Sequence, residues 1–401
     1  MHGQIILWAE ILGYILAAHL VMKRWRGLWR EFVFTALNVA ALYLFFFYGK
    51  GSRSTPTFLA YLAVVVFQYL MLRLFGGKKG WRPWLAFFTP ILALILIRYV
   101  PSSLYAGSHF PYGPLFIGIS YLAFRTSLLV LEVRNGTAPL PGFLRHLGFC
   151  FFVPTMPVGP INPYANYHRA FDVAPPFIPP GRAWLRILVG LVKYKFVGNV
   201  CFQMTYTNLL FDDHYHPRVD LAVAVVFYYL FLYCNFSGFC DMAIGAAGLI
   251  GIPVAENFNN PFAARNVRDF WNRWHITLSQ YMRDVVFAPL SKFLVRLTGP
   301  AFANHAIALT IVVVFLLVGI WHGAGWNFAA FGAAHALGVV VNHYYTIGLK
   351  KWLGRDGFKA YNLNPWIRAA AVALTFCYCA ATLFLFANTF PEMKEIFSSM
   401  R

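Results

Sequence analysis

Apolar stretches long enough to cross a membrane follow one another along the chain, separated by short polar segments. An α-helix needs about 17–20 apolar residues to span a bilayer, and shorter stretches can be tilted or re-entrant. Backbone groups find no partners in lipid, so such stretches are expected to be helical. Ten can be distinguished, at roughly 5–21, 32–48, 58–72, 84–97, 115–130, 187–200, 221–233, 306–321, 328–341 and 369–386. The pattern predicts an all-α, polytopic membrane protein with about 9–12 membrane segments, some of them re-entrant.

Composition argues against a soluble fold. Hydrophobic residues make up 59% of the 401 residues and charged residues 12%, too few to cover the surface of a soluble protein of this size. The first apolar run has no basic segment before it and no small-residue cleavage site after it. We therefore expect it to be a retained anchor rather than a signal peptide.

The net charge of +19 is distributed as membrane topology predicts. Basic residues follow the first, third and fifth apolar runs, at 23–30, 73–82 and 134–145, whereas the loops at 49–57 and 100–113 carry two and none. An excess of lysine and arginine marks the cytoplasmic side of a membrane, so we predict an extracytoplasmic N-terminus. We attribute the charge to topology and to attraction for anionic headgroups or an acidic cytoplasmic partner, and not to nucleic-acid binding.

Two apolar stretches are interrupted by residues that disfavour a spanning helix. The segment 151–161 contains three prolines, the last of them Pro160. Proline stops helix propagation, so this segment is predicted to be re-entrant and to line a pocket, or else to form an interfacial loop. In 235–241 polar and small residues interrupt the run, and Asp241 is interpreted either as a helix N-cap or as a site residue.

The six cysteines lie within or beside apolar runs and lack the spacing of zinc ligands. We expect them to be buried as small hydrophobic side chains, and we expect no metal site.

The segment 255–290 combines arginines with aromatic residues. If 267–283 is helical, Arg268, Trp271, His275 and Ser279 fall on one stripe. A basic helix with tryptophans suits the cytoplasmic interface, where it would lie flat or dip into the protein. The alternative is a surface-anchoring helix with no chemical role.

His322 stands where an apolar run ends, between Trp321 and Gly323. An imidazole with an unperturbed pKa near 6.5 would be kept neutral by burial and could accept a proton. Ionisable groups at membrane depth are expensive, which favours a functional residue over a satisfied core histidine. His335 is interpreted as a residue that hydrogen-bonds between helices. The remaining histidines are expected in loops or at the interface: His2, His19, His109, His146, His168, His214, His216, His305 and His343.

Common catalytic templates are missing from the sequence. We find no GxSxG elbow, HExxH helix, Walker loop, EF-hand pattern or clustered aspartates for magnesium. A transporter would also be polytopic with broken helices, but the two halves of the chain show no matching broken segments. The residues therefore favour a membrane enzyme with a histidine base.

Several motifs resemble the signature of the membrane-bound O-acyltransferase family. The main ones are 256–262 (ENFNNPF), 269–275 (DFWNRWH) and 319–323 (GIWHG). Shorter matches occur in order at 118–121, 132–136, 152–161 and 235–245. Together they are similar to the bacterial branch that contains the teichoic-acid D-alanyl transfer protein and the alginate O-acetyltransferase, and the layout is closest to the former.

The resemblance implies one domain over 1–401, with N-terminal helices at 1–110, a family core at 111–345, and a C-terminal loop and last helix at 346–401. It implies a helical ring around a central tunnel in the bacterial cytoplasmic membrane. The donor would be a phosphopantetheine thioester on an acyl carrier protein, or acyl-CoA. The acceptor would be a hydroxyl of an envelope polymer or an intermediate, with a small membrane or periplasmic accessory protein as a further partner. No bound cofactor is implied.

The resemblance also implies roles for individual residues. His322 matches the family's catalytic histidine and would be the general base. His275 matches its second site residue and would orient or polarise the thioester carbonyl, or hold the pantetheine arm. Arg268 and Arg283 would dock the carrier. The expected substrate-binding or tunnel residues are Trp321, Trp274, Arg273, Asn259, Asn260, Ser237, Asp241 and Pro160.

Two segments depart from the D-alanyl branch. Asn162-Pro163 stands where that branch commonly has Asp and Arg, and Asn235 replaces a frequent Asp. The acyl group is therefore expected to be D-alanyl or acetyl. Two alternatives remain, an acyl-CoA-dependent lipid or protein O-acyltransferase and a non-enzymatic scaffold or transporter of an envelope-modification system.

Overall fold

The computed structural model describes residues 2–49, 54–99, 118–172, 177–206 and 217–398. The predicted loop at 100–113 lies outside them, as do His109, His214 and His216. The described residues are helical apart from turns and one isolated antiparallel bridge, Phe258 to Trp274. The all-α prediction is confirmed.

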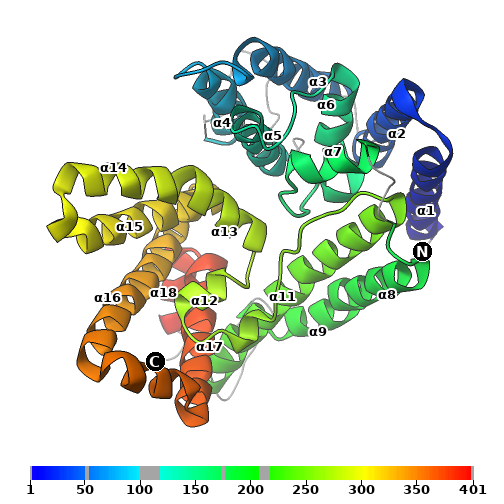
Figure 1. The fold of residues 1–401 in the computed structure, drawn as a ribbon. Coiled ribbons are helices and arrows are strands. Elements are labelled where there is room, and N and C mark those ends of the chain that lie inside the picture. Colours follow the sequence, from blue (N-terminus) through cyan, green and yellow to red (C-terminus); the bar gives the residue numbers. More distant parts are fainter. Residues whose placement is uncertain (1, 50–53, 100–117, 173–176, 207–216, 399–401) are drawn as a thin grey trace. The chain divides into compact units, whose positions relative to one another are not determined.

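The chain divides into two compact units, 1–191 with 239–256, and 192–238 with 257–401. The first unit contains α1 (His2–Arg24), α2 (Gly27–Phe46), α3 (Ser54–Met71), α4 (Pro83–Tyr99), α5 (Ile119–Arg134), α6 (Phe143–Cys150), α7 (Tyr164–Asp172) and α8 (Pro180–Leu191). The second contains α9 (Gly198–Gln203), α12 (Val267–Trp271), α13 (Ile276–Met282), α14 (Ala288–Thr298), α15 (Ala303–His322), α16 (Trp326–Leu363), α17 (Pro365–Ala387) and α18 (Phe390–Ser398). The long helix α11 (Pro217–Ile250) starts in the second unit and ends in the first (Figure 1).

Short π and 3-10 turns join or extend these helices. The π turns are Leu72–Gly76, Val192–Val197 and Arg283–Phe287, and the 3-10 turns are Val153–Thr155, Pro261–Ala263 and Pro300–Phe302.

Five helical segments in the described ranges are long and apolar enough to cross a membrane. They are 27–46, 54–76, 218–250, 300–322 and 365–387, and 83–97 is a shorter apolar helix. A polytopic membrane protein is thereby confirmed. The larger number of segments counted from the sequence, the ring and the tunnel stay predictions.

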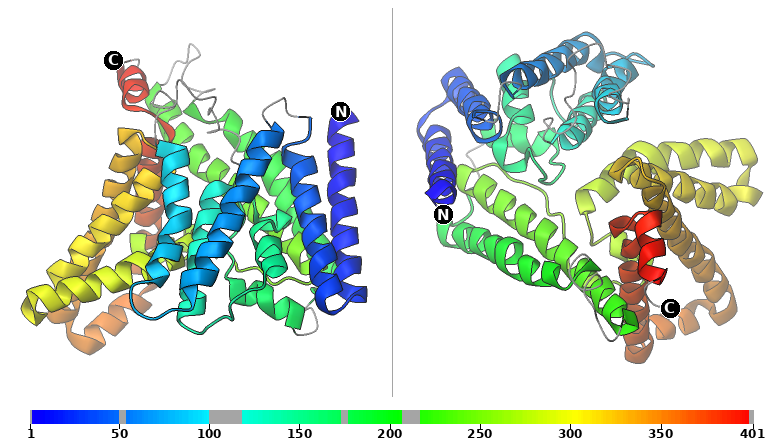
Figure 2. Two further views of the ribbon diagram at one scale, coloured as in Figure 1. Left: turned by 90° about the horizontal axis from the view of Figure 1, so that it is seen from above. Right: turned by 180° about the vertical axis from the view of Figure 1, so that it is seen from behind.

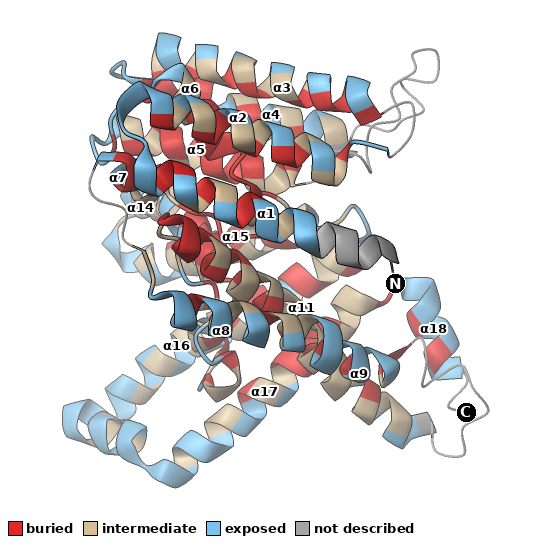
Figure 3. Cartoon of the chain, turned by 90° about the vertical axis from the view of Figure 1, so that its right-hand side faces the viewer, coloured by how far each residue is buried: buried red, intermediate tan, exposed pale blue. Residues whose placement is uncertain are grey.

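The burial pattern of α3 is that of a helix facing lipid. Thr57, Tyr61 and Gln68 are at most 1% exposed, whereas Leu59 and Phe67 are more than half exposed (Figure 3). In water, exposing these apolar side chains while polar ones are buried would be unfavourable. In hydrocarbon the apolar side chains can face outward. The exposed apolar side of α3 therefore suits a bilayer.

The proline-rich segment 151–161 is confirmed as non-spanning. It forms a 3-10 turn at Val153–Thr155 and is otherwise irregular and mainly buried, Pro160 included. The buried guanidinium of Arg125 donates to Thr155 Oγ1 (2.8 Å) and to the Cys150 carbonyl (2.9 Å), so protein groups replace water around this backbone. Gly118, with φ of 71°, lets α5 begin against Met156, whose carbonyl a Cβ would approach to 2.0 Å.

The structure corrects the interpretation of Asp241. The helix α11 runs unbroken through 235–241, so Asp241 is not an N-cap. Its carboxylate accepts a hydrogen bond from Arg186 Nε (3.1 Å), and the same guanidinium binds Glu256 through two nitrogens (2.6 and 2.5 Å). Arg186, 55 positions away in sequence, satisfies the carboxylate of Asp241, so the helix can carry this acid within an otherwise apolar stretch.

In the second unit, α15 packs along α16, and α14 lies beside α15 (Figures 1 and 2). The helix α16 continues past Val341 as a largely exposed arm (Figure 3) that kinks at Gly354. The C-terminal ends of α15 and α17 and the N-terminal part of α16 carry residues of the candidate site.

Candidate active site

His322 is the last residue of α15, as the end of the apolar run predicted. Its half-buried ring is surrounded by aromatic rings from three helices. The centroid of Trp321 lies 4.5 Å away, that of Phe386 on α17 4.9 Å, and that of Phe331 on α16 6.0 Å. These rings limit the access of water to the imidazole and hold its position, as a proton-transfer group requires.

Glycines explain how α15 can bring His322 so close to α16. A Cβ on Gly319 would come within 2.3 Å of the Phe328 carbonyl, and one on Gly323 within 2.2 Å of the Phe328 ring. Across the interface, a Cβ on Gly332 would lie 2.4 Å from the Phe315 carbonyl. Such close backbone approach between small residues is the usual basis of helix pairing in membranes. The glycines of 319–323 are therefore packing residues that place the histidine between them.

Residues 267–283 do not form one helix, so the condition for a stripe that includes His275 is not met. The helix α12 ends at Trp271, α13 begins at Ile276, and His275 between them has the left-handed backbone φ of 45° and ψ of 51°. Asn266 caps α12 by accepting from the Asp269 N–H (2.8 Å), and Asp269 in turn accepts from Arg273 Nε (2.9 Å). These local bonds favour a short helix and a turn, so His275 does not share a helical stripe with Arg268 and Trp271.

A second segment, 257–260, holds His275 in this conformation. The carbonyl of Asn257 accepts from the Ile276 N–H (3.0 Å), and the Asn259 N–H donates to the Arg273 carbonyl (2.9 Å). The two segments thus pair like a minimal antiparallel ladder around the Phe258 to Trp274 bridge. Residues 257–260 of the ENFNNPF motif therefore form a clamp on the segment that carries His275.

His275 and His322 contact the same tryptophan. The Trp321 ring centroid lies 6.2 Å from that of His275 and 4.5 Å from that of His322. His275 is buried and also contacts Phe236 of α11, with centroids 4.8 Å apart. It lies outside the five candidate spans, and burial, with a smaller contribution from His322, lowers its pKa to about 3. At neutral pH the His275 ring is therefore uncharged.

Comparison with known proteins shows the family to which the chain belongs. The sequence profile of MBOAT, the membrane-bound O-acyltransferase family, matches residues 50–383. The chain belongs to this family. It is thus a multi-pass membrane O-acyltransferase, and the motif that contains His322 lies inside the matched region.

Individual relatives are similar over most of the chain. A teichoic acid D-alanyltransferase of Streptococcus thermophilus is 28% identical over 84% of this chain and 82% of its own length. That of Bacillus subtilis is 29% identical over 74% of this chain and 75% of its own length. A probable alginate O-acetylase AlgI of Azotobacter vinelandii is 30% identical over 55% of this chain and 42% of its own length.

The other candidate residues of the acyltransferase differ in their surroundings. Trp274 is buried, with its ring 5.0 Å from that of Phe258. Arg273 pairs with Asp269 and donates to the Asn259 carbonyl (3.3 Å), which adds a side-chain hydrogen bond between the clamp and the segment that carries His275. The neighbouring Asn260 is exposed and has a φ of 45°.

Three further candidates lie away from the clamp in sequence. Ser237 is buried on α11, one residue from the ring of Phe236 that contacts His275. Asp241 and Pro160 belong to the first unit, where Asp241 pairs with Arg186. Their part in a tunnel stays a prediction.

His335 has the structural role that the sequence indicated. Its Nδ1 accepts from the indole Nε1 of Trp271 (3.2 Å), and its Nε2 lies 3.0 Å from Thr382 Oγ1. The Thr382 hydroxyl donates to the Cys379 carbonyl (3.0 Å), so Nε2 of a neutral His335 is the donor to Thr382. Both ring nitrogens are used, and α12, α16 and α17 are tied together.

Replacement of His335 by alanine is expected to destabilise the protein without removing a reacting group. The change leaves the buried Trp271 N–H without its acceptor, which costs about 1–3 kcal/mol. Thermal unfolding in detergent should show a lower midpoint than for His305→Ala, which truncates an exposed histidine on α15. Equal midpoints for the two variants would contradict this role.

Two other expectations need correction. His146 is fully buried on α6, not in a loop or at the interface, because α6 packs between α2 and α7. Cys377 is exposed, whereas the other five cysteines are buried as expected. Within the described ranges, no group of three or more His, Cys, Asp or Glu side chains could hold a metal ion.

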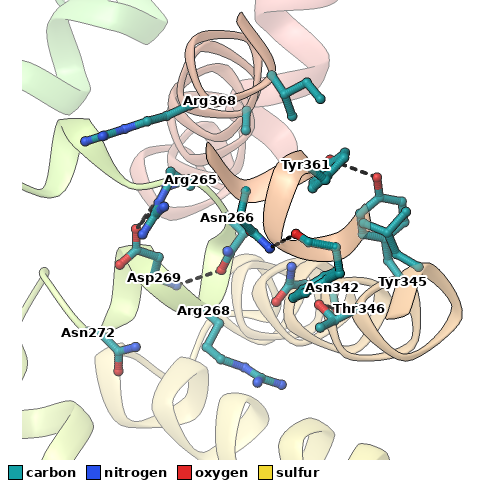
Figure 4. Close-up of a pocket in the computed structure, with 15 residues that line it drawn as sticks. Arg265, Asn266, Arg268, Asp269, Asn272, Asn342, Tyr345, Thr346, Tyr361 and Arg368 are labelled. Atoms are coloured by element: carbon teal, nitrogen blue, oxygen red, sulfur yellow. Dashed lines mark hydrogen bonds and ion pairs between the residues drawn. The ribbon is translucent and has the colours of Figure 1, made fainter. Parts of the chain in front are cut away.

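Two cavities open beside α12. One, of about 370 Å³, is polar and is lined by Arg265, Asn266, Asp269, Tyr345 and Tyr361 among others (Figure 4). Figure 4 shows Arg265 turned toward Asp269, and Tyr345 is hydrogen-bonded to Tyr361 (2.9 Å). Because Arg265 pairs with Asp269, its positive charge is largely compensated and contributes little to the binding of an anion in this cavity.

The second cavity, of about 500 Å³, is mostly apolar. Residues of α13, α15 and α16 form its walls, among them Leu278, Ile311, Val314, Phe315 and Val339. Arg268 and Arg283 line it together with Trp271 and Ser279, and its lining contains no acidic residue. An elongated ligand with an anionic end and an uncharged chain fits this distribution of charge.

Proposed function

We propose that this protein transfers a small acyl group, D-alanyl or acetyl, from a cytoplasmic thioester across the membrane to a hydroxyl of a cell-envelope polymer or an intermediate acceptor. The proposal rests on His322 and His275, whose rings both lie against the ring of Trp321. The relatives support the choice of acyl group, because they are named as teichoic acid D-alanyltransferases and a probable alginate O-acetylase. We further propose a bacterial cytoplasmic membrane and an extracytoplasmic N-terminus.

In this reaction His322 removes the proton of the acceptor hydroxyl. The hydroxyl oxygen forms a bond to the acyl carbonyl carbon, the bond from that carbon to the donor sulfur breaks, and the thiol leaves with the proton returned by the imidazolium. A positioned base of this kind contributes about 10²–10⁴-fold to the rate. The surrounding rings of Trp321, Phe331 and Phe386 keep bulk water, which would hydrolyse the thioester, away from the imidazole.

The donor is proposed to reach the site past the apolar cavity beside α12. Arg268 and Arg283 at this cavity provide positive charge for an acidic acyl carrier protein or for the phosphates of acyl-CoA. Arg268 is exposed and lies 3.4 Å from His343 Nδ1 through Nη2, and Arg283 is exposed beside Asp284 (3.6 Å). Exposed charges of this kind act mainly on the rate of association.

Reversing these charges is expected to weaken donor use without changing the chemical step. In the Arg268→Glu, Arg283→Glu double variant, KM for the donor should rise roughly tenfold or more at low salt, with kcat retained. Steady-state kinetics at two ionic strengths would measure this, and Arg182→Glu, at an exposed arginine that lines neither cavity, is the control. An unchanged KM would remove the docking role.

The identity of the donor can be decided with the same preparation. Acyl carrier thioester and acyl-CoA would be offered separately to purified protein, and transfer to a hydroxyl acceptor measured. Exclusive use of the CoA ester would contradict carrier docking and favour an acyl-CoA-dependent lipid or protein O-acyltransferase.

The departure at Asn162 has a structural explanation. Its side chain is buried, donates to the Pro253 carbonyl (3.0 Å) and accepts from the Ala255 N–H (3.2 Å). A neutral amide supplies both a donor and an acceptor, which a carboxylate does not. Asn162 therefore supports the chain just before the 257–260 clamp, and its neutrality does not decide between D-alanyl and acetyl transfer.

A further inference from the structure

The side chain of Asn257 lies beside His275 and is held by hydrogen bonds from Thr277. It is 1% exposed, and its Oδ1 accepts from the Thr277 N–H (3.1 Å) and from the Thr277 hydroxyl (2.8 Å). The same oxygen lies 3.3 Å from Nδ1 of His275. None of these bonds was expected from the sequence, where Asn257 was only part of a motif.

The bonds determine which atom of the amide faces the histidine. A backbone N–H can only donate, so the Asn257 atom that receives the Thr277 N–H is the oxygen and not the nitrogen. An amide oxygen has no proton to give. His275 Nδ1 must therefore carry the hydrogen in its contact with Asn257, and in a neutral ring this leaves the lone pair on Nε2.

We propose that Asn257 is a positioning residue that fixes His275 as the Nδ1–H tautomer, so that Nε2 accepts a hydrogen bond from an N–H or O–H of the bound substrate. The inference rests on the proposed function, because it assumes that the ring of His275 meets substrate. It selects between the roles considered for this residue. A ring whose Nε2 has no hydrogen cannot donate from that atom to the oxygen of a thioester carbonyl, but it can hold an amide N–H of a pantetheine arm or a hydroxyl.

The backbone of His275 adds to the argument. A left-handed φ of 45° is uncommon for a residue with a side chain and persists where its surroundings hold it. Here the Asn257 carbonyl binds the Ile276 N–H while the Asn257 side chain binds Thr277, so one residue controls the chain immediately after His275. Both the direction of the ring and its tautomer depend on Asn257.

The decisive experiment is nitrogen NMR of the histidine rings in the full-length protein in detergent. Protein labelled with 15N in its imidazoles would be compared with the His275→Gln variant, whose missing signals identify His275. We expect Nδ1 to show a protonated signal and Nε2 an unprotonated one at neutral pH. The opposite pattern, or a mixture of both tautomers, would overturn the inference.

Two variants test the cause. Asn257→Ala removes the acceptor and should abolish the single tautomer and lower kcat by about 10–100-fold, the scale seen when the outer hydrogen-bond partner of a ligating histidine is lost. Asn257→Asp retains an acceptor oxygen and should restore the Nδ1–H form. If Asn257→Ala does not fold, the wild-type and Asn257→Asp spectra alone decide.

A matched control separates positioning from stability. Thr277→Val removes the 2.8 Å hydroxyl bond to Asn257 but keeps the Thr277 N–H, so it should lower the unfolding temperature while leaving the His275 ring signals in place. Loss of the tautomer in Thr277→Val would contradict the role given to Asn257. The outcomes also distinguish this inference from the proposed function. An Nδ1–H ring in a protein without acyl transfer refutes only the function, and an Nε2–H ring in an active enzyme refutes only the inference.

Discussion

Replacement of His322 by alanine is expected to lower acyl transfer about 10²–10⁴-fold, the contribution of a positioned general base. The loss is expected because the end of α15 places the His322 ring among those of Trp321, Phe331 and Phe386. In the described part of the chain, no other imidazole contacts all three rings and could replace it. Initial rates with a labelled acyl donor would measure the loss, with kcat expected to fall more than KM changes.

The control for this variant is His305→Ala, which removes an exposed histidine near the opposite end of the same helix. Its kcat should equal that of the wild type. The His322→Ala protein should also elute and unfold like the wild type, because the ring is half-buried and its removal leaves the helix contacts in place. Full activity in a folded His322→Ala protein would refute the assignment of the base.

Replacement of Gly319 by leucine is expected to disrupt the second unit. The new Cβ would lie 2.3 Å from the Phe328 carbonyl and 3.2 Å from Gly332 Cα, so α15 and α16 would have to separate. Insertion of side-chain volume into a packed interface usually costs about 1–3 kcal/mol, and here the obstacle is backbone rather than a movable side chain. We expect a lower unfolding temperature, a poor yield of monodisperse protein and loss of transfer.

The matched control is Gly348→Leu, at a glycine of α16 where a Cβ meets nothing within 4 Å. Leucine has a higher helix propensity than glycine, so this variant should be as stable as the wild type or slightly more stable. Thermal unfolding of the two variants in the same detergent tests the prediction. If Gly319→Leu unfolds at the same temperature as Gly348→Leu, the close approach of α15 and α16 is not what holds His322.

The position of His322 at the end of a helix could be predicted from the sequence because its signal is local. The apolar run before Trp321 and the small residues after His322 are contiguous, and the helix ends where the pattern changes. The same holds for the segment 151–161, in which the prolines alone exclude a regular span. In both cases the residues that determine the local backbone lie within the segment itself, so the sequence of that segment is enough to predict it.

The errors have the opposite origin. Periodicity suggested one helix through His275. Besides the local bonds of Asn266 and Asp269, the turn at His275 is held by Asn257 and Asn259, which hydrogen-bond to 273–276 from another segment. The interruption read at Asp241 is compensated by Arg186 on α8. Asn257 was overlooked as a site residue for the same reason, because an asparagine between Glu256 and Phe258 gives no sign that its oxygen will receive Thr277.

Acyl transfer across a sealed bilayer is the most direct test of the proposed function. Purified protein would be reconstituted into vesicles containing a hydroxyl acceptor, labelled acyl carrier thioester would be added outside, and acyl ester formed in the lumen would be quantified. The account predicts luminal ester with the wild type and almost none with His322→Ala. Equal luminal ester with both proteins, or thioester consumed without any ester appearing, would contradict it.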